Sequence, residues 1–170
     1  MKITGYKAFD PGMKNKYGMT FEEGKTYTVE GEIISGTHGN GYHFAANLED
    51  SIHFIIDEEH KDVVVAKVTG EGIVKTFTTE DDEFSDLYVA SQLTINHILT
   101  REEIITHMLN KRPYFAQRFI RKFPLTVEEQ QLFKEKFSTD WSFQRAMAYY
   151  QEGDKEVYNR YYKSLVKTKK

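Results

Sequence analysis

The sequence contains no cysteine among its 170 residues, and it lacks any apolar run near the length of a membrane-spanning helix, about 18 residues. The absence of thiols excludes disulfides, thiol nucleophiles and cysteine-ligated zinc, and it suits a reducing cytoplasm. Residues 1–10 also lack the apolar core of a secretory signal. We therefore expect a cytoplasmic protein that has no membrane partner.

Arginine is missing from the first 100 residues, because all six arginines follow that point. Residues 1–100 hold 8 lysines and 17 acidic residues, a net charge of −9, whereas residues 101–170 hold 15 basic and 9 acidic residues, a net charge of +6. This asymmetry fits a polyanionic partner for the second half, and it equally fits two halves that attract each other. Charge alone leaves both interpretations open.

Large apolar side chains are plentiful in this chain. Twelve phenylalanines and eleven tyrosines are enough to build a core, so a globally disordered chain is excluded. The length fits one domain, or one domain with a helical extension. No internal repeat or low-complexity linker divides the sequence.

The first 98 residues show the patterns of an antiparallel sheet. Apolar residues alternate with polar ones in several runs, and glycine or proline clusters separate these runs. A short helix is predicted over 48–55, with the Asn47 side chain capping its first turn. The predicted strands cover residues 2–9, 26–34, 44–46, 62–68, 73–78 and 87–98, and a turn at 69–72 joins 62–68 to 73–78 as a hairpin.

Helix signals replace strand signals at Thr100. Thr100 with Glu103, and Thr126 with Glu129, have the spacing of capping boxes, in which the hydroxyl and the carboxylate each accept a hydrogen bond from a free backbone amide. Pro113 suits the first position of another helix. The predicted helices cover residues 100–110, 112–123, 126–137, 140–150 and 154–166.

These patterns together predict an α+β fold, in which a curved antiparallel β-rich N-terminal part is followed by a C-terminal helical bundle. We expect a β-rich domain over residues 1–99 and a helical region over residues 100–170. Because no Gly/Ser-rich linker marks the change, we expect the helical region to be closely docked on the β-rich domain.

Three short motifs resemble those of a known family. They are Tyr-Lys-Ala-Phe-Asp at 6–10, Phe-Glu-Glu-Gly-Lys-Thr-Tyr at 21–27 and Gly-Tyr-His-Phe at 41–44. In this order they resemble an uncharacterised domain family of phage, prophage and related bacterial proteins, over roughly residues 5–105. The resemblance implies a phage or mobile-element setting in a bacterial host cytoplasm, and no established activity. The family often has a cysteine soon after the histidine, where this chain has Ala45 and Ala46.

The glycine- and histidine-rich stretch at 35–44 is the first candidate site. Imidazole and carboxylate groups suit transition metals, but the spacing of the four histidines in this region matches no known metal motif. The glycines lack the Gly-Lys-Ser/Thr sequence of a phosphate-binding loop. We therefore expect no metal and no cofactor, and we interpret these histidines as surface and packing residues: His38, His43, His53 and His60.

Nucleotide-transfer chemistry is an alternative for the same stretch. In this hypothesis Tyr42 and His43 grip a nicotinamide ribose, and Glu71 or Glu83 orients a hydroxyl, as in small ADP-ribosyl-transfer folds. The argument depends on analogy at the level of the fold. The other interpretation is that Tyr42 packs and His43 forms hydrogen bonds within the fold.

A basic helix over 111–122 is the second candidate site. Arginine forks suit phosphates, and aromatic rings such as Tyr114 can stack on bases, so this helix could contact nucleic acid. The other interpretation is a solvated face that docks on the acidic N-terminal half. The basic residues of this candidate site are Lys111, Arg112, Arg118, Arg121 and Lys122.

The sequence contains no constellation typical of hydrolysis and no nucleotide fingerprint. We therefore expect binding rather than catalysis. Our leading hypothesis is a phage- or prophage-type accessory protein that binds a host protein and inhibits host defence or nucleic-acid processing. The alternatives are the nucleotide-using enzyme built around Tyr42 and His43, and a nucleic-acid-binding module that uses the basic helix.

Overall fold

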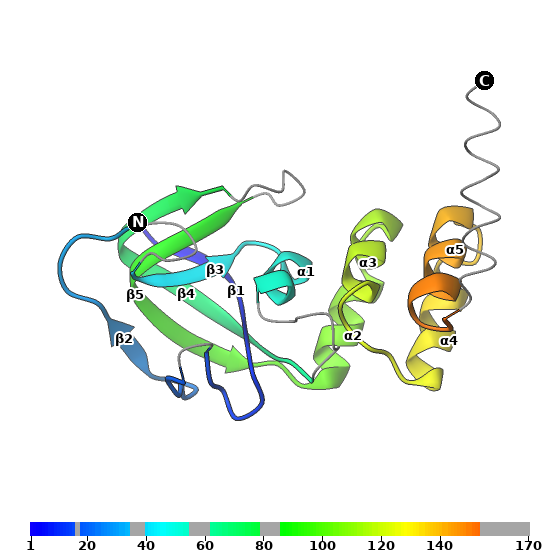
Figure 1. The fold of residues 1–170 in the computed structure, drawn as a ribbon, viewed down its shortest axis with the longest axis horizontal. Coiled ribbons are helices and arrows are strands. Elements are labelled where there is room, and N and C mark those ends of the chain that lie inside the picture. The colour runs from blue at the N-terminus through cyan, green and yellow to red at the C-terminus, as the bar shows by residue number, and fades with distance from the viewer. Residues whose placement is uncertain (16–17, 35–39, 55–61, 79–85, 154–170) are drawn as a thin grey trace, which may run out of the picture. The chain divides into compact units, whose positions relative to one another are not determined.

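The computed structural model of the protein describes residues 1–15, 18–34, 40–54, 62–78 and 86–153. The chain divides into two compact units, Met1–Arg101 and Glu102–Lys170. The first, called here the β unit, contains an antiparallel sheet, and the second, the helical unit, contains helices (Figure 1). The predicted α+β fold is thereby confirmed, while the close docking of the two regions stays a prediction.

Five antiparallel strands build the sheet of the β unit. Its order is β2-β5-β3-β1-β4, and β4 also pairs with β5, so that β1, β4, β5 and β3 form a closed ring. Strand β2 lies outside this ring and pairs with β5. The elements are β1 (Ile3–Phe9), β2 (Thr26–Thr28), β3 (Tyr42–Ala45), helix α1 (Leu48–Ser51), the 3-10 helix η1 (Ile52–Phe54), β4 (Val64–Phe77) and β5 (Leu87–Ile98).

The predicted hairpin at 62–78 is wrong, because this segment contains one long strand, β4. Gly72 lies in a β-bulge rather than a turn: the register with β5 shifts between Glu71 and Val74, and Gly72 has a φ of 76°. The hydroxyl of Ser91 on β5 accepts a hydrogen bond of 2.8 Å from the Ile73 amide at this bulge. The Ile73 amide therefore finds its hydrogen-bond partner on the neighbouring strand β5, whereas in a turn the partner would come from a residue close in sequence.

A phenylalanine from β3 fills the middle of the sheet's core. A Cβ atom on Gly70 of β4 would lie 2.6 Å from the Phe44 ring, and one on Gly5 of β1 would lie 2.9 Å from it. The two glycines therefore make room for a fully buried ring between strands that are far apart in sequence. The other buried members of this core are Phe9, Met13, Phe21, Tyr42, Ala66, Val68, Ala90, Leu93 and Ile95.

Two further local predictions are corrected. The strand predicted over 26–34 ends at Thr28, and the helix predicted over 48–55 is divided into α1 and η1. Asn47 is the N-cap residue of α1, but its side chain makes no capping hydrogen bond. Its Nδ2 atom instead lies 3.4 Å from Oδ2 of Asp50, a buried carboxylate.

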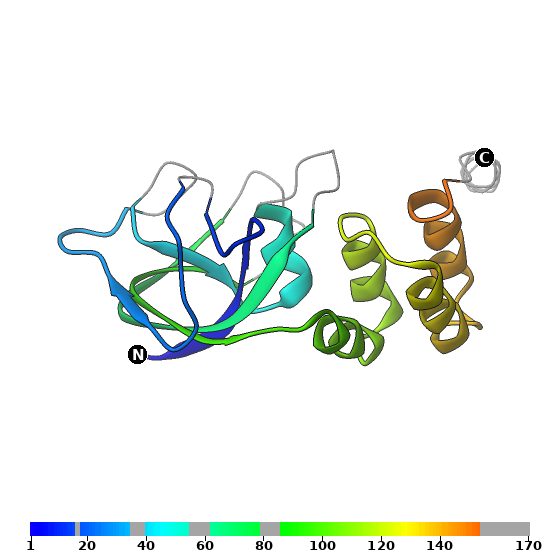
Figure 2. The ribbon, with the colours of Figure 1, turned by 90° about the horizontal axis from the view of Figure 1, so that it is seen from below.

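Helix α2 (Arg101–Leu109) leads into α3 (Pro113–Ile120), α4 (Val127–Lys136) and α5 (Trp141–Tyr150), which can be followed in Figure 2. The capping box of α4 is confirmed: Glu129 N donates to the Thr126 hydroxyl at 3.1 Å, and Thr126 N donates to the Glu129 carboxylate at 2.8 Å. The Asp140 carboxylate caps α5 by accepting from Phe143 N at 2.7 Å. The helix predicted from residue 154 lies outside the described residues.

Phenylalanine rings form the core of the helical unit. The Phe119 ring lies 4.6 Å from that of Phe123 and 6.2 Å from that of Phe133. Phe143 of α5 lies 6.1 Å from Phe133 and 4.7 Å from Phe137. Phe119 and Phe123 are four residues apart, as are Phe133 and Phe137, so one-turn spacing at the ends of α3 and α4 already brings each pair together.

Glutamine side chains connect the ends of these helices. The Gln151 amide donates to the carbonyl oxygens of Ile120 at 2.6 Å and Phe123 at 3.1 Å, and its Oε1 atom accepts from Leu125 N at 2.9 Å. The Gln144 amide, two turns earlier in the sequence, donates to the carbonyl oxygens of Lys134 at 3.2 Å and Phe137 at 2.9 Å, at the C-terminal end of α4. These bonds satisfy carbonyl groups that every helix leaves open at its C-terminal end.

Candidate binding surfaces

Tyr42 and His43, the predicted pair of the glycine- and histidine-rich stretch, lie on β3. Tyr42 is buried in the core with its ring against Phe21, and burial raises the pKa of its hydroxyl, with Tyr27 a lesser cause. The His43 ring packs instead on Phe77, 5.0 Å away. Because successive side chains of a strand point to opposite faces, these two residues do not converge on one ligand.

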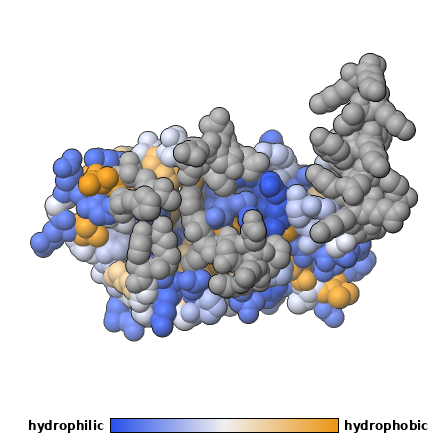
Figure 3. Space-filling view, viewed as in Figure 1, coloured by the Kyte–Doolittle hydropathy of each residue, from blue (hydrophilic) through white to orange (hydrophobic). Residues whose placement is uncertain are grey.

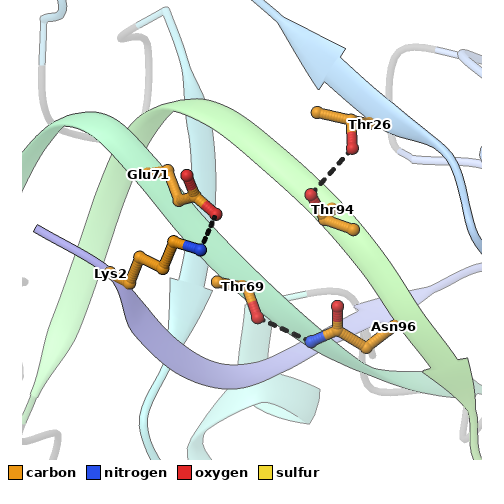
Figure 4. A network of polar contacts seen from close by, with 6 residues as sticks. All are labelled: Lys2, Thr26, Thr69, Glu71, Thr94 and Asn96. Carbon is orange, nitrogen blue, oxygen red and sulfur yellow. Dashed lines mark hydrogen bonds and ion pairs between the residues drawn. The ribbon is translucent and has the colours of Figure 1, made fainter.

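Of the two carboxylates assigned to the enzyme hypothesis, the structure describes Glu71 alone. Glu71 lies on β4 and forms an ion pair of 3.4 Å with Lys2 (Figure 4). Glu83 lies outside the described residues. Of the four histidines considered for a metal, His38 and His60 also lie outside them. Within the part that the structure describes, no group of three or more metal-ligating side chains is found.

Buried carboxylates beside β1 were not predicted. Glu49 and Asp50 on α1 are both fully buried. Burial raises the pKa of Tyr6 on β1, and the charge of Glu49 raises it further. The only sequence signal for this group is weak: two adjacent acidic residues lie between the apolar positions Leu48 and Ile52 of the predicted helix.

The basic residues predicted at 111–122 are distributed over several environments. Arg112 is exposed at the N-cap of α3, and the Lys111 ammonium lies 5.5 Å from the ring centre of Phe115. Arg118 is only 5% exposed, so it does not share a solvated face with the others. Arg121 and Lys122 are half-buried just after α3.

Helices α3 and α5 lie side by side and run in the same direction. Between the middle of α3 and the start of α5, the Gln117 amide and the Ser142 hydroxyl are 3.0 Å apart. Near their ends, the Arg121 guanidinium lies 5.8 Å from the ring centre of Tyr150. The first turn of α5 therefore lies beside the middle of α3, and the last residues of the two helices lie beside each other.

Each of the two helices has an exposed aromatic ring in its first turn. Tyr114, one turn before Gln117, is 59% exposed, and Trp141, next to Ser142, is 52% exposed. The Arg145 guanidinium lies 5.0 Å from the ring centre of Trp141. We call this set the α3–α5 surface; its residues are Arg112, Tyr114, Gln117, Trp141, Ser142 and Arg145.

Neither α3 nor α5 contains an acidic residue, whereas α2 and α4 together contain five glutamates. The α3–α5 surface therefore joins exposed rings and guanidinium groups with no carboxylate on its own helices. The sequence did contain a signal for it that the prediction missed, namely the Trp141–Arg145 spacing of four residues, which brings two side chains together on a helix.

The outer face of the sheet carries a row of threonines. Thr4 of β1 pairs with Thr69 of β4, Thr69 with Thr94 of β5, and Thr94 with Thr26 of β2. The hydroxyls of Thr26 and Thr94 are 2.8 Å apart, and the Asn96 amide donates to Thr69 at 2.6 Å (Figure 4). These polar groups satisfy one another, so the row stabilises the solvated face of the sheet.

Hydrophilic residues cover most of the coloured surface in Figure 3, with small separate apolar patches. Among the residues that the structure describes, no helix combines the length and the apolar character needed to span a membrane.

These features define a class of protein: a small α+β protein with a largely closed antiparallel sheet and a helical unit that presents arginine and aromatic side chains. The chain belongs to the family described as a domain of unknown function (DUF7666), whose model matches residues 3–107. The resemblance to an uncharacterised family is thereby confirmed, while its phage or prophage setting stays a prediction. The match ends within α2, before the α3–α5 surface. No curated protein and no solved structure matches the chain.

Proposed function

We propose that this protein acts by binding a macromolecular partner, and that the α3–α5 surface is the contact. The observation that carries this proposal is that Tyr114 and Trp141 are exposed, with Arg145 over the Trp141 ring, on two adjacent helices that contain no acidic residue. Tryptophan, tyrosine and arginine are the residue types that most often dominate the energy of protein interfaces.

The arginine geometry suits an anionic partner. Arg145 stacked on Trp141 presents a flat, preordered guanidinium whose edge can donate two parallel hydrogen bonds to a carboxylate. Little side-chain entropy would be lost on binding, because the stack already restricts the arginine. A partner with acidic side chains beside an apolar pocket would bind the Arg145 guanidinium and the exposed aromatic rings together.

A protein partner is favoured over nucleic acid by the charge balance. Residues 102–153 hold eight basic and seven acidic residues, so the described part of the helical unit is nearly neutral. Nucleic-acid binding draws most of its affinity from several phosphate contacts at once. With Arg118 buried, fewer cations are available on this surface than the sequence suggested.

The biological setting belongs to the same proposal. The family resemblance supports a phage or prophage accessory protein in a bacterial host cytoplasm. Its partner would be a host protein of defence or nucleic-acid processing, which the protein inhibits by covering an acidic surface.

Affinity capture from a bacterial host lysate, with and without nuclease, tests the proposal. Wild-type protein should retain a stoichiometric partner protein after nuclease, and a variant with Arg112→Glu and Arg145→Glu should lose it. A variant with Lys67→Glu and Lys136→Glu has the same change in charge at exposed sites elsewhere, and it should retain the partner. Arg118 is left unchanged because reversing a buried charge would destabilise the fold.

Two results would contradict the proposal. Equal capture by both variants would remove the α3–α5 surface from the contact. Capture that disappears with nuclease would replace the partner protein by nucleic acid, and the affinity should then fall steeply with salt. Circular dichroism of each variant shows whether the helices are retained.

A further inference from the structure

Strand β2 has one open edge. Each of the other four strands pairs with at least two neighbours, because β1, β4, β5 and β3 close upon one another. Among the described residues, β2 pairs with β5 alone. Open edges offer backbone donors and acceptors to an added strand, and proteins use them to bind extended peptides.

The hydrogen bonds show which backbone groups lie on the open edge. Lys25 O accepts from Ile95 N at 3.0 Å, and Val29 N donates to Ser91 O at 2.8 Å. In residues 25–29, the backbone groups of the odd-numbered residues therefore point toward β5. The backbone N–H and C=O groups of Thr26 and Thr28 alternate with these and point toward the open edge. Within the described residues, the backbone groups of these two threonines have no hydrogen-bond partner.

The two faces of β2 differ in polarity. Tyr27 and Val29 are half-buried and pack against the core of the sheet. Thr26 and Thr28 are exposed on the outer face, where Thr26 ends the row of threonines. An added strand would therefore place apolar side chains beside Tyr27 and Val29, and polar ones beside the threonines.

The charge around the edge selects the partner. The segment at 22–32 carries a net charge of −3, and its lysine already pairs with a glutamate of the same segment. Two copies of such an edge would repel each other, whereas a basic strand would be attracted. The charged residues are Glu22, Glu23, Lys25, Glu30 and Glu32, with Lys25 paired to Glu22.

We propose that the open edge of β2 binds an extended, basic segment of a partner protein with alternating apolar and polar residues. The segment adds a strand to the sheet by hydrogen bonding to Thr26 and Thr28. This site lies in the β unit and is independent of the α3–α5 surface. Affinity comes from backbone hydrogen bonds, and selectivity comes from the alternating faces and the glutamates.

A synthetic peptide of alternating valine and threonine with lysines at both ends provides the probe. In heteronuclear NMR, it should shift the amide signals of residues 24–30 and slow hydrogen exchange at Thr26 and Thr28. Thr28→Pro should weaken binding about tenfold or more, because it removes an outward amide and obstructs the edge. Proline fits an edge strand where the amide faces solvent, so the pairing of β2 with β5 should survive.

Matched controls separate the edge from general effects. Thr28→Ser keeps the backbone and should bind as wild type does. A peptide with N-methylated valines tests the backbone bonds without changing the protein, and it should not bind. A peptide with glutamates in place of lysines should bind more weakly, because the edge is acidic.

Three outcomes would overturn the proposal. The first is no binding by wild type, and the second is equal binding by Thr28→Pro or by the N-methylated peptide. The third is self-association of the wild type, measured by sedimentation velocity and lost in Thr28→Pro, which would make a second copy the occupant. Capture through the α3–α5 surface is measured separately, so either proposal can fail alone.

Discussion

The β unit and the helical unit satisfy their backbone groups in different ways. In the β unit, partners come from strands far apart in sequence, as when Ser91 serves the bulge beside Ile73. In the helical unit, partners come from nearby residues, as in the capping box of Thr126 and Glu129. The second kind of bond is encoded within a few residues, and the first depends on the whole sheet.

The same contrast applies to charge. The segment around β2 is acidic and borders an open edge, whereas α3 and α5 contain no carboxylate and present exposed rings. The two proposed surfaces therefore differ in chemistry: backbone groups at the edge of β2, and side chains on α3 and α5. This difference suggests variants that act on one unit at a time.

The largest effect is expected from opening either core. Phe44→Ala in the β unit and Phe133→Ala in the helical unit each remove a fully buried ring, which should lower the free energy of unfolding by about 3–5 kcal/mol. Hydrogen exchange read by mass spectrometry should accelerate in β4 and β5 for the first variant, and in α3–α5 for the second. Faster exchange across the whole chain in both variants would mean that the units unfold as one.

A smaller effect is expected at the glutamine that joins α3 to α5. Gln151→Ala leaves the Ile120 and Phe123 carbonyls and the Leu125 amide without this partner, which should cost about 1–3 kcal/mol. Gln130→Ala removes a single bond of 3.2 Å to Leu125 O and serves as the control. Urea unfolding, followed by fluorescence of the sole tryptophan, should show a larger loss of unfolding free energy for Gln151→Ala than for Gln130→Ala. Equal losses would contradict a special role of Gln151 in joining α3 to α5.

The smallest effect concerns alkaline pH and the β unit. Burial raises the pKa of Tyr6 and Tyr42 above the ordinary value of about 10. The folded state thus holds these protons more tightly than the unfolded state, so the stabilisation is complete below about pH 10 and is lost as pH rises through the folded pKa. Tyr42→Phe should remove a late-titrating component from the absorbance at 295 nm.

That titration also distinguishes the units. Exchange protection of β3 and β5 should decline above pH 10 in the wild type and decline less in Tyr42→Phe. Tyr6→Phe should remove a second late component. A tyrosine absorbance curve that is unchanged in both variants would contradict the burial of these hydroxyls.

Local signals predicted the helical unit well, for physical reasons. Capping at Thr126 and Asp140 and the proline at the start of α3 act within one helical turn, so the residues involved are neighbours in sequence. The burial of Arg118 was not predictable in this way, because its spacing along α3 suits a basic face as well as a buried position.

The topology of the β unit was predicted only in part. The strands at β1 and β5 were visible as alternating patterns, but glycines at 70 and 72 indicated a turn where β4 continues. Glycine has the same local preference in a turn, in a bulge and beside a large ring. Only the position of Phe44 on another strand decides between these roles.

The candidate surfaces also divide into features that the local sequence determines and features that only the tertiary structure determines. The sequence by itself determined the α+β class, the absence of thiol chemistry, the capped helices and the family. The tertiary structure alone decided that Tyr42 and His43 face apart, that α3 and α5 lie side by side, and that β2 keeps an open edge. The physical reason is that propensity and capping act within a turn, whereas pairing and burial depend on residues that only the folded chain brings together.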